Sequence, residues 1–109
     1  MTEQKKKLAG SGCCPACRQK ASPRSEADLR RLQNRLRRMV GQINGISKML
    51  EENRYCGDIL IQVAAVESAI QSFGYLVLQD HLRTCVVEEI QKGDTAILDE
   101  AMELIRKLK

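Results

Sequence analysis

The stretch LRRLQNRLRRMVGQINGISKML, residues 29–50, decides the fold of this chain. Its large apolar residues recur at alternating steps of three and four, the heptad spacing of a helix that packs against another helix along one seam. We expect Ser22 to cap this helix and Pro23 to occupy its first position. Asn53 suits the left-handed conformation in which many helices end. The members of the seam are Leu29, Leu32, Leu36, Met39, Ile43, Ile46 and Leu50.

Two further helices follow this one. From about Gly57 to Gln91 a wide apolar stripe continues without a proline, which predicts a helix buried on more than one side. Gly74, its one interior glycine, is the only candidate for a break, and we expect the helix to continue through it. The turn KGDT, residues 92–95, precedes a third helix that Asp94 can cap. Because no segment is typical of a strand, the sequence predicts an all-α fold of three helices.

The length and cysteine usage limit the class of protein. At 109 residues the chain holds at most one globular domain, with residues 1–24 as a flexible basic leader and residues 25–109 as a helical domain. Five cysteines are an odd number, and the rest of the sequence is rich in helix formers, which argues against a secreted disulfide scaffold. No apolar run approaches the ~20 residues that span a bilayer, and no signal peptide is visible. We therefore expect a soluble, cytoplasmic protein with no membrane partner.

The net charge of +4 conceals an asymmetry between the two halves of the chain. Residues 1–54 hold 13 Lys/Arg against 5 Asp/Glu, whereas residues 55–109 hold 5 against 9. A basic half in a small soluble protein indicates a polyanionic partner, most often nucleic acid. A solvated basic face without any partner explains the composition equally well. No paired acid and base or activated nucleophile is visible, so the sequence argues against an enzyme.

The stretch HLRTC, residues 81–85, holds the only histidine of the chain four residues before a cysteine. On a helix His81 and Cys85 point the same way, and imidazole with thiolate suits Zn, Cu(I) or Ni. Ordinary packing of two unrelated side chains is the alternative. The candidate third ligand, Cys56, lies 25 residues earlier, about 37 Å away along a continuous helix. A second copy packed antiparallel would bring its own Cys56 to this pair, and three soft ligands suit a three-coordinate Cu(I) ion.

Three longer stretches carry a resemblance to a known family. RLQNRLRRMVGQINGI (residues 31–46), ENRYCGDILIQVAAVESAI (52–70) and LQDHLRTCV (78–86) closely resemble the copper-sensitive operon repressors, bacterial metal- and stress-sensing repressors with an all-helical fold. The resemblance covers about residues 28–109. It implies a homodimer built on an antiparallel four-helix bundle and a flat homotetramer of two such dimers. It also implies that the metal-free protein binds double-stranded operator DNA and releases it on binding Cu(I).

The resemblance assigns roles to single residues as well. It implies that Cys56, His81 and Cys85 bind Cu(I) across the dimer interface. It also implies that Tyr55 and Glu100 surround the site as outer-shell groups, although the match of Glu100 requires a one-residue deletion in the preceding turn. A surface phenol and a solvated carboxylate are the plainer alternatives for these last two residues.

For DNA binding, the resemblance points to Arg35, which lies in the NRL motif of the first helix. Arginines on a helical face neutralise phosphates, so we expect polar neighbours on the same helix to join it. A solvated face is again the alternative. The expected neighbours are Arg31, Arg38, Gln42 and Lys48.

Two other functions are compatible with this sequence. The first is a thiol- or persulfide-responsive repressor on the same scaffold, which would use Cys56 and Cys85 as a dithiol. The resembling persulfide-sensing branch lacks the histidine, so His81 favours copper. The second is a structural helical dimer with no role on DNA. The leader adds the stretch CCPAC, whose thiols are an auxiliary copper-capture site, a redox switch or incidental; they belong to Cys13, Cys14 and Cys17.

Overall fold

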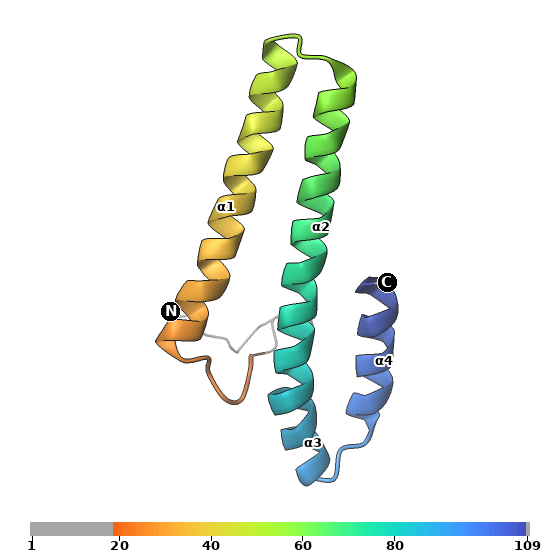
Figure 1. Ribbon diagram of the computed structural model, residues 1–109. Helices are drawn as coiled ribbons and strands as arrows, with labels where there is room; N and C mark the ends of the chain where they lie inside the picture. Colours follow the sequence, from red (N-terminus) through yellow and green to blue (C-terminus); the bar gives the residue numbers. More distant parts are fainter. Residues whose placement is uncertain (1–18, 109) are drawn as a thin grey trace, which may run out of the picture.

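The computed structural model describes residues 19–108, and every regular element within that range is a helix (Figure 1). Helix α1 (Glu26–Glu51) and helix α2 (Cys56–Asp80) run side by side in opposite directions. Helix α4 (Ala96–Leu108) folds back against the second half of α2. The fold is therefore all-α with three helical rods, as the sequence predicts.

Helix α1 begins three residues later than the sequence predicts. Its N-cap is Ser25, whose Oγ accepts a hydrogen bond from the Asp28 N–H at 3.1 Å. Two acidic residues in the first turn add negative charge where the helix dipole favours it. The expectation that Ser22 caps the helix and Pro23 opens it is wrong. Ser22 instead donates a hydrogen bond to the Glu88 carboxylate, which holds it away from the helix end.

A short turn joins α1 to α2. Glu52 closes α1, and Asn53 adopts a positive φ of 55°, as predicted. The Arg54 N–H donates to the Met49 carbonyl at 3.0 Å, which satisfies one of the carbonyl groups that a helix end leaves open. This turn puts Cys56 at the first position of α2.

The second rod continues without interruption over residues 56–91, and we call it the long helix. Its α-helical turns give way to a π-helical segment, η2 (His81–Val86), and return in α3 (Val87–Gln91). No break occurs at Gly74, as predicted. A Cβ at Gly74 would meet Leu108 Cδ2 at 2.8 Å, so the missing side chain lets the end of α4 approach α2 closely. The sequence does not predict the π segment, because HLRTCV contains no glycine or proline that would mark it.

Helix α4 follows a tight turn. Gly93 has a φ of 92°, a conformation that glycine adopts without strain. The Ala96 N–H then donates to Asp94 Oδ1 at 3.0 Å. The predicted capping role of Asp94 is therefore confirmed.

The buried core of the single chain is small. Val86, Ile97 and Ala101 form one cluster where α4 packs on η2, and Met39 is buried separately on α1. Four other members of the heptad seam are exposed, Leu50 the most at 61%; the other three are Leu29, Leu36 and Ile43. A seam that is patterned for packing but stays exposed leaves apolar surface for a further partner.

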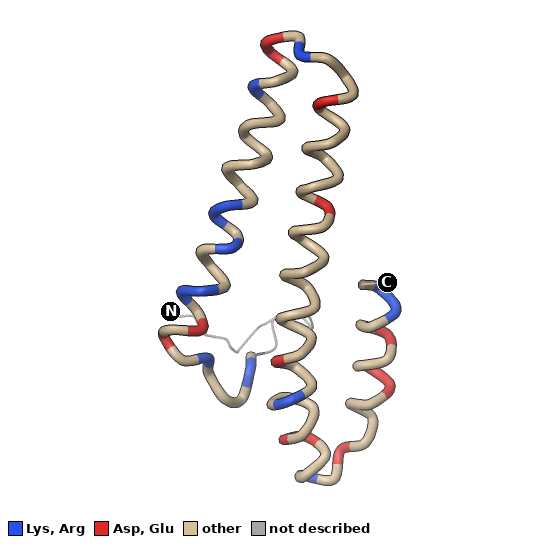
Figure 2. The backbone as a smooth tube through the Cα atoms, viewed as in Figure 1, with Lys and Arg blue, Asp and Glu red and all other residues tan. Residues whose placement is uncertain are grey.

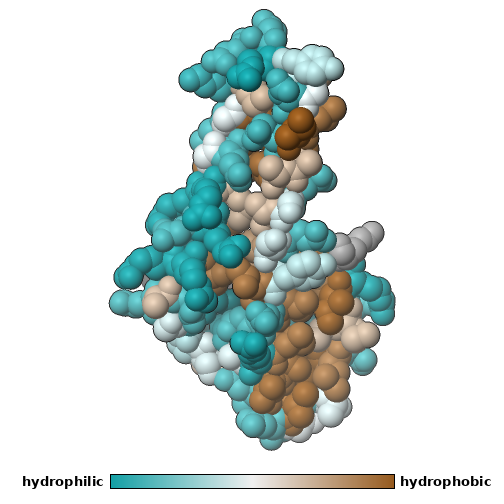
Figure 3. Space-filling view, viewed as in Figure 1, coloured by the Kyte–Doolittle hydropathy of each residue, from teal (hydrophilic) through white to brown (hydrophobic). Residues whose placement is uncertain are grey.

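The chain is elongated, with extents of 55 × 31 × 27 Å. Its radius of gyration is 18.0 Å, against about 13 Å for a compact domain of this length. Figure 3 shows apolar surface where the lower half of the long helix and α4 lie, and hydrophilic surface over α1.

By length and composition alone, the long helix would also suffice to cross a membrane, because one 18-residue window has a mean hydropathy of 1.3. We expected no apolar run long enough to span a bilayer, and this helix meets only the criteria of length and composition. A helix that packs against other helices on several sides has the same composition.

Candidate metal centre and nucleic-acid interface

His81 and Cys85 both lie on η2 and line the same groove, as their spacing predicts. Both are half-buried. The Thr84 hydroxyl donates to the Asp80 carbonyl at 2.9 Å, a side-chain bond that loosens the regular helical pattern. The same hydroxyl oxygen lies 3.6 Å from Cys85 Sγ. Some of the polar groups beside the two candidate ligands are therefore their own neighbours in the chain.

The groove has a volume of about 710 Å³ and lies between the second half of α2, η2 and α4. Apolar side chains such as Phe73, Val77 and Leu104 form much of its wall. Residues 19–24, which precede α1, form another part of the lining. Charged and polar groups interact more strongly in such a weakly polar setting than in water.

The donor atoms of the pair fit a soft metal ion. Cys85 is a free thiol, and His81 Nε2 is buried without a hydrogen-bond partner among the described residues. Leaving a buried polar atom unsatisfied costs about 1–3 kcal/mol, so this nitrogen favours a partner beyond the described side chains. Thiolate and imidazole are ligands for Cu(I) and for Zn²⁺, but two ligands leave either ion incompletely coordinated.

Cys56 lies far from this pair. It is exposed at the start of α2, and 25 residues of continuous helix separate it from His81, about 37 Å at the helical rise. Within residues 19–108, no three His, Cys, Asp or Glu side chains come close enough to hold one ion. One chain thus presents two candidate ligands at one end of the long helix and a third at the other.

The two predicted outer-shell residues lie at opposite ends as well. Tyr55 is 76% exposed beside Cys56, with its ring folded over Gly57. Glu100 is half-buried on α4 and is not among the side chains that line the groove with His81. Tyr55 therefore accompanies Cys56, whereas Glu100 lies on the helix that packs near His81.

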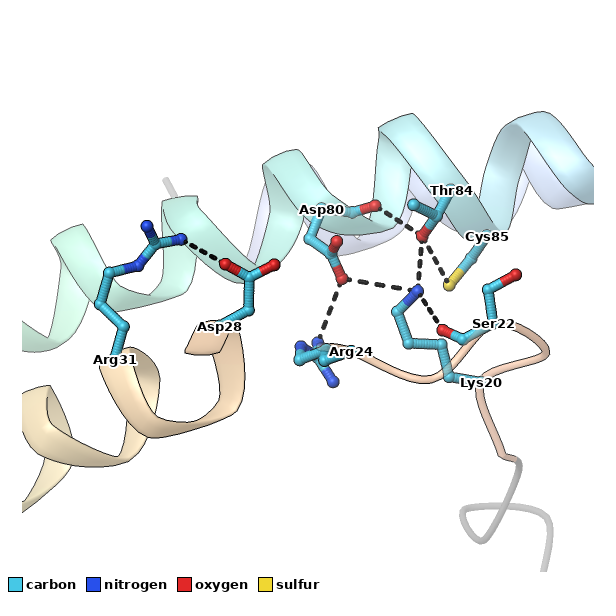
Figure 4. A network of polar contacts seen from close by, with 8 residues as sticks. All are labelled: Lys20, Ser22, Arg24, Asp28, Arg31, Asp80, Thr84 and Cys85. Carbon is cyan, nitrogen blue, oxygen red and sulfur yellow. Dashed lines mark hydrogen bonds and ion pairs between the residues drawn. The ribbon is translucent and has the colours of Figure 1, made fainter. Parts of the chain in front are cut away.

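A polar network that the sequence does not predict lies beside the ligand pair (Figure 4). Lys20 Nζ donates to Thr84 Oγ1 at 2.7 Å and lies 3.6 Å from Asp80 Oδ2. Arg24 lies 3.4 Å from the same carboxylate oxygen, and the bond from Ser22 to α3 adds a further contact. No pattern in the linear sequence could have found this network, because Lys20 and Thr84 are 64 residues apart.

The basic surface of the chain follows α1 (Figure 2). Arg31, Arg35 and Arg38 follow one another at steps of four and three, which puts them on one stripe with Gln42. The three arginines are exposed, and Gln42 is half-buried. Arg31 forms an ion pair with Asp28 at 2.9 Å, whereas the described residues provide no ion pair for Arg35 or Arg38. These two guanidinium groups are free to meet phosphates.

Lys48 is exposed but lies on another side of α1. At 3.6 residues per turn it sits about 100° around the helix from the arginine stripe. It would contact DNA together with the stripe only if the DNA covers two sides of α1. The predicted auxiliary thiols, Cys13, Cys14 and Cys17, lie outside the described residues.

The chain matches a known family over nearly its whole helical part. Residues 28–107 match the sequence model of the family described as metal-sensitive transcriptional repressor. This span holds most of α1, the whole long helix and nearly all of α4. The chain therefore belongs to this family of transcriptional repressors, and the resemblance noted in the sequence is confirmed.

Individual relatives show which metal-sensing repressors the chain is similar to. The chain is 36% identical over 85 residues to the copper-sensing transcriptional repressor CsoR of Bacillus subtilis (strain 168), across 77% of this chain and 84% of that protein. The copper-sensing repressor CsoR with Cu(I) from Geobacillus thermodenitrificans NG80-2 superposes with a TM-score of 0.76 at 36% identity, across 81% of this chain and 93% of that one. The nickel-responsive transcriptional regulator InrS superposes with a TM-score of 0.66 at 36% identity, across 81% of this chain and 100% of that one. The fold is thus shared by regulators named for two different metals.

Proposed function

We propose that this protein is a Cu(I)-responsive transcriptional repressor that binds double-stranded operator DNA without metal and releases it when Cu(I) binds. The observation that carries the proposal is the arrangement of the soft ligands. His81 and Cys85 face one groove, and Cys56 is exposed about 37 Å away, so a second chain must complete the site. Similarity to copper-sensing relatives supports the same choice of metal.

The unit that binds metal is a homodimer in which two long helices pack antiparallel. Crossing near Ile70 brings Cys56 of each copy to His81 and Cys85 of the other, which gives two identical sites related by a two-fold axis. The exposed apolar surface of the long helix supports this pairing: Ile70 is 50% exposed, and none of the most apolar window is buried in the single chain. We further propose that two such dimers form a flat homotetramer.

Two thiolates and one imidazole form a soft donor set. Bound Cu(I) would be satisfied by these three ligands, whereas structural Zn²⁺ sites use four protein ligands. The contribution of each chain is to hold His81 and Cys85 on one side of η2, with the Thr84 hydroxyl beside the sulfur. This preorganised pair makes copper a better candidate than the metals that require a fourth protein ligand.

Tyr55 and Glu100 supply the hydrogen bonds around the imidazole in this proposal. Because Tyr55 precedes Cys56, its phenol reaches the other copy whenever Cys56 does. Because His81 has two ring nitrogens, one can bind Cu(I) while the other donates a hydrogen bond to a phenol or carboxylate oxygen. Outer-shell groups of this kind fix the orientation and basicity of a ligating imidazole.

The DNA-binding surface is the basic stripe of α1, with Lys48 at its flank. Its charged members neutralise phosphates, so affinity should fall steeply with salt. Release of DNA requires only that metal and DNA prefer different arrangements of the helices, a coupling of about 1–3 kcal/mol. The residues of this surface are Arg31, Arg35, Arg38, Gln42 and Lys48.

The remaining assignments follow from this function. A repressor acts where the DNA is, so we place the protein in the cytoplasm, without a membrane partner. Residues 25–109 form the sensing and DNA-binding domain, and residues 1–24 form its leader. The leader thiols act as an auxiliary capture site for Cu(I), because three thiols within five residues match the softness of the ion; they belong to Cys13, Cys14 and Cys17.

A thiol- or persulfide-responsive repressor is the second candidate. The observation that favours it is that Cys56 and Cys85 are both free, the first exposed and the second half-buried. This function would leave His81 without a role, although its buried Nε2 is unsatisfied. For that reason we rank it below copper sensing.

A gel-shift assay with DNA from upstream of the protein's own gene tests the proposal. We expect the metal-free, reduced protein to shift this DNA at low salt and to lose affinity as salt rises. One equivalent of Cu(I) per chain should release the DNA. Equal amounts of Zn²⁺, Ni²⁺ and a persulfide donor, added separately, should release less.

The His81→Ala variant decides between the two candidates. It should bind Cu(I) weakly and keep its DNA in the presence of copper, whereas the neighbouring surface variant Gln79→Ala should respond like the unmodified protein. If the His81→Ala variant still binds Cu(I) tightly and still releases DNA, copper sensing through this site is wrong. If a persulfide donor releases DNA and Cu(I) does not, the thiol function replaces it.

A further inference from the structure

Residues 19–24, which we call the strap, form no helix yet lie against the second half of the long helix (Figure 4). Lys20 is the centre of the contact. Its Nζ donates to Thr84 Oγ1 at 2.7 Å and to the Ser22 carbonyl at 2.9 Å, and it lies 3.6 Å from Asp80 Oδ2. Arg24 reaches the same carboxylate at 3.4 Å. The strap is therefore attached by several polar contacts rather than by one.

These contacts are more sheltered than the other ion pairs of the chain. The Lys20 and Asp80 side chains are 16% and 32% exposed, whereas Arg31 and Asp28 are 70% and 51% exposed. Exposed ion pairs contribute little, but hydrogen-bonded charges in a sheltered setting contribute more. The docked strap is thus expected to be a populated state of the protein.

The docked state is also incompletely satisfied. Arg24 Nε and Glu88 Oε1 are buried without a hydrogen-bond partner among the described residues, and Asp80 Oδ2 has ion pairs at 3.4 and 3.6 Å but no hydrogen bond. Buried polar atoms left unsatisfied oppose the contacts that attach the strap. Docked and released states should therefore lie close in free energy, so that a modest local change can shift the balance between them.

The positions of these contacts connect the two functional parts of the chain. Asp80 directly precedes His81, and Thr84 directly precedes Cys85, so the strap is held by the neighbours of both candidate ligands. At its other end Arg24 directly precedes Ser25, the N-cap of α1. The strap therefore runs from the ligand segment η2 to the first turn of the basic helix.

We propose that the strap couples the metal ligands to the DNA-binding helix, with Lys20, Asp80 and Thr84 as positioning residues; this rests on the function proposed above. In the metal-free protein the strap is docked and fixes the start of α1. Ligands drawn toward a second chain displace the backbone of residues 80–85. Because hydrogen bonds tolerate little displacement, the strap then leaves its site and α1 loses its fixed start.

Hydrogen exchange tests the strap without DNA. Peptides that cover residues 28–32 at the start of α1, where the Asp28 and Leu29 N–H groups donate to Ser25, should exchange slowly in the metal-free protein and about tenfold faster after one equivalent of Cu(I) per chain. In the Asp80→Asn variant they should exchange fast in both states. The Glu103→Gln variant, which removes the same charge from an exposed ion pair with Arg106 on α4, should behave like the unmodified protein.

DNA affinity gives a second test in which the sign of the effect is decisive. Asp80→Asn removes a negative charge, so simple electrostatics predicts tighter binding to DNA, whereas loss of the strap predicts binding about tenfold weaker in the metal-free state. Lys20→Met changes only the strap and leaves the long helix intact. We expect both variants to bind DNA more weakly in the metal-free state. Their affinity for DNA should also fall less when Cu(I) is added.

The outcomes separate this proposal from the function on which it rests. A protein that binds Cu(I) and releases DNA while exchange at residues 28–32 stays unchanged overturns the strap alone. An Asp80→Asn variant that matches Glu103→Gln in metal-free DNA affinity does the same. A protein that binds no Cu(I) overturns both proposals.

Discussion

The rest of the chain packs against one end of the long helix and leaves the other end exposed. At its start Cys56 is exposed, and Leu60 and Ile61 are each 65% exposed. At its other end the helix carries Val86, which is 4% exposed, and there α4 and residues 19–24 cover it. One end is therefore packed and carries two candidate ligands of the proposed site, and the other is an open surface that carries a single thiol.

In the proposed dimer, this difference would let one short chain form a metal site only when two copies assemble. The packed end fixes two ligands before any partner arrives, so little ordering is needed there. The open end is helical in the single chain as well, and in the proposed dimer a second copy would cover its exposed apolar side chains. A metal that needs both ends must then bind at the boundary between chains, where it can alter their arrangement.

The largest effect that we predict concerns this division between chains. Cys56→Ser and Cys85→Ser should each weaken Cu(I) binding by more than about a hundredfold, because losing a ligand costs more than losing an outer-shell group. Mixing the two variants after unfolding and refolding them together should restore tight binding at about a quarter of the sites. Each mixed dimer has one intact site and one that lacks both thiols. Competition with a Cu(I) chelator measures the restored fraction.

Two outcomes of the mixing experiment have clear meanings. A mixture that regains nothing would contradict the sharing of ligands between chains. Tight binding by the Cys56→Ser variant alone would show that the packed end needs no partner. A variant that carries both substitutions, unfolded and refolded alone, serves as the control for copper bound elsewhere in the chain.

The next largest effect that we predict is on the free energy of unfolding, where substitutions at the two ends of the long helix should act differently. Ile97→Ala removes a side chain that is 6% exposed within one chain, so it should lower the free energy of unfolding by about 3 kcal/mol. Ile61→Ala at the open end should act mainly through association, and its cost should depend on protein concentration. Urea unfolding at two concentrations separates the two. Equal costs at low concentration would mean that the packed end is no core.

Much of this comparison is visible in the sequence, and part of it is not. The steps of three and four in residues 29–50 give α1, because helical periodicity is a local property. The spacing of His81 and Cys85 likewise puts both on one groove. Their distance from Cys56 also follows from helix length alone.

The structural features that could not be predicted from the sequence depend on contacts between distant segments. Lys20 meets Thr84 across 64 residues, and nothing in either neighbourhood marks the pairing. Two local signals compete for the start of α1. Ser25 stands three residues before an acid, and Ser22 is followed by a proline. Only the attachment of Ser22 to Glu88 decides between them.

A smaller effect is expected for the basic stripe of α1. Arg35→Ala should weaken DNA binding about tenfold and reduce the slope of log affinity against log salt by about one. Arg37→Ala is the matched control, because it removes the same charge from another side of α1, where Arg37 donates to Asn34. Fluorescence anisotropy across a salt series measures both. Equal losses in the two variants would mean that α1 acts by overall charge rather than through one stripe.

The smallest effect concerns the junction between the packed end and α1. Ser25→Ala removes the N-cap acceptor of the Asp28 N–H and should cost about 1 kcal/mol of unfolding free energy. Ser47→Ala, at an exposed position within the same helix, should be neutral or slightly stabilising because alanine has the higher helix propensity. Thermal unfolding followed by circular dichroism compares the two variants. A loss from Ser47→Ala as large as that from Ser25→Ala would show that the packed end does not depend on where α1 is capped.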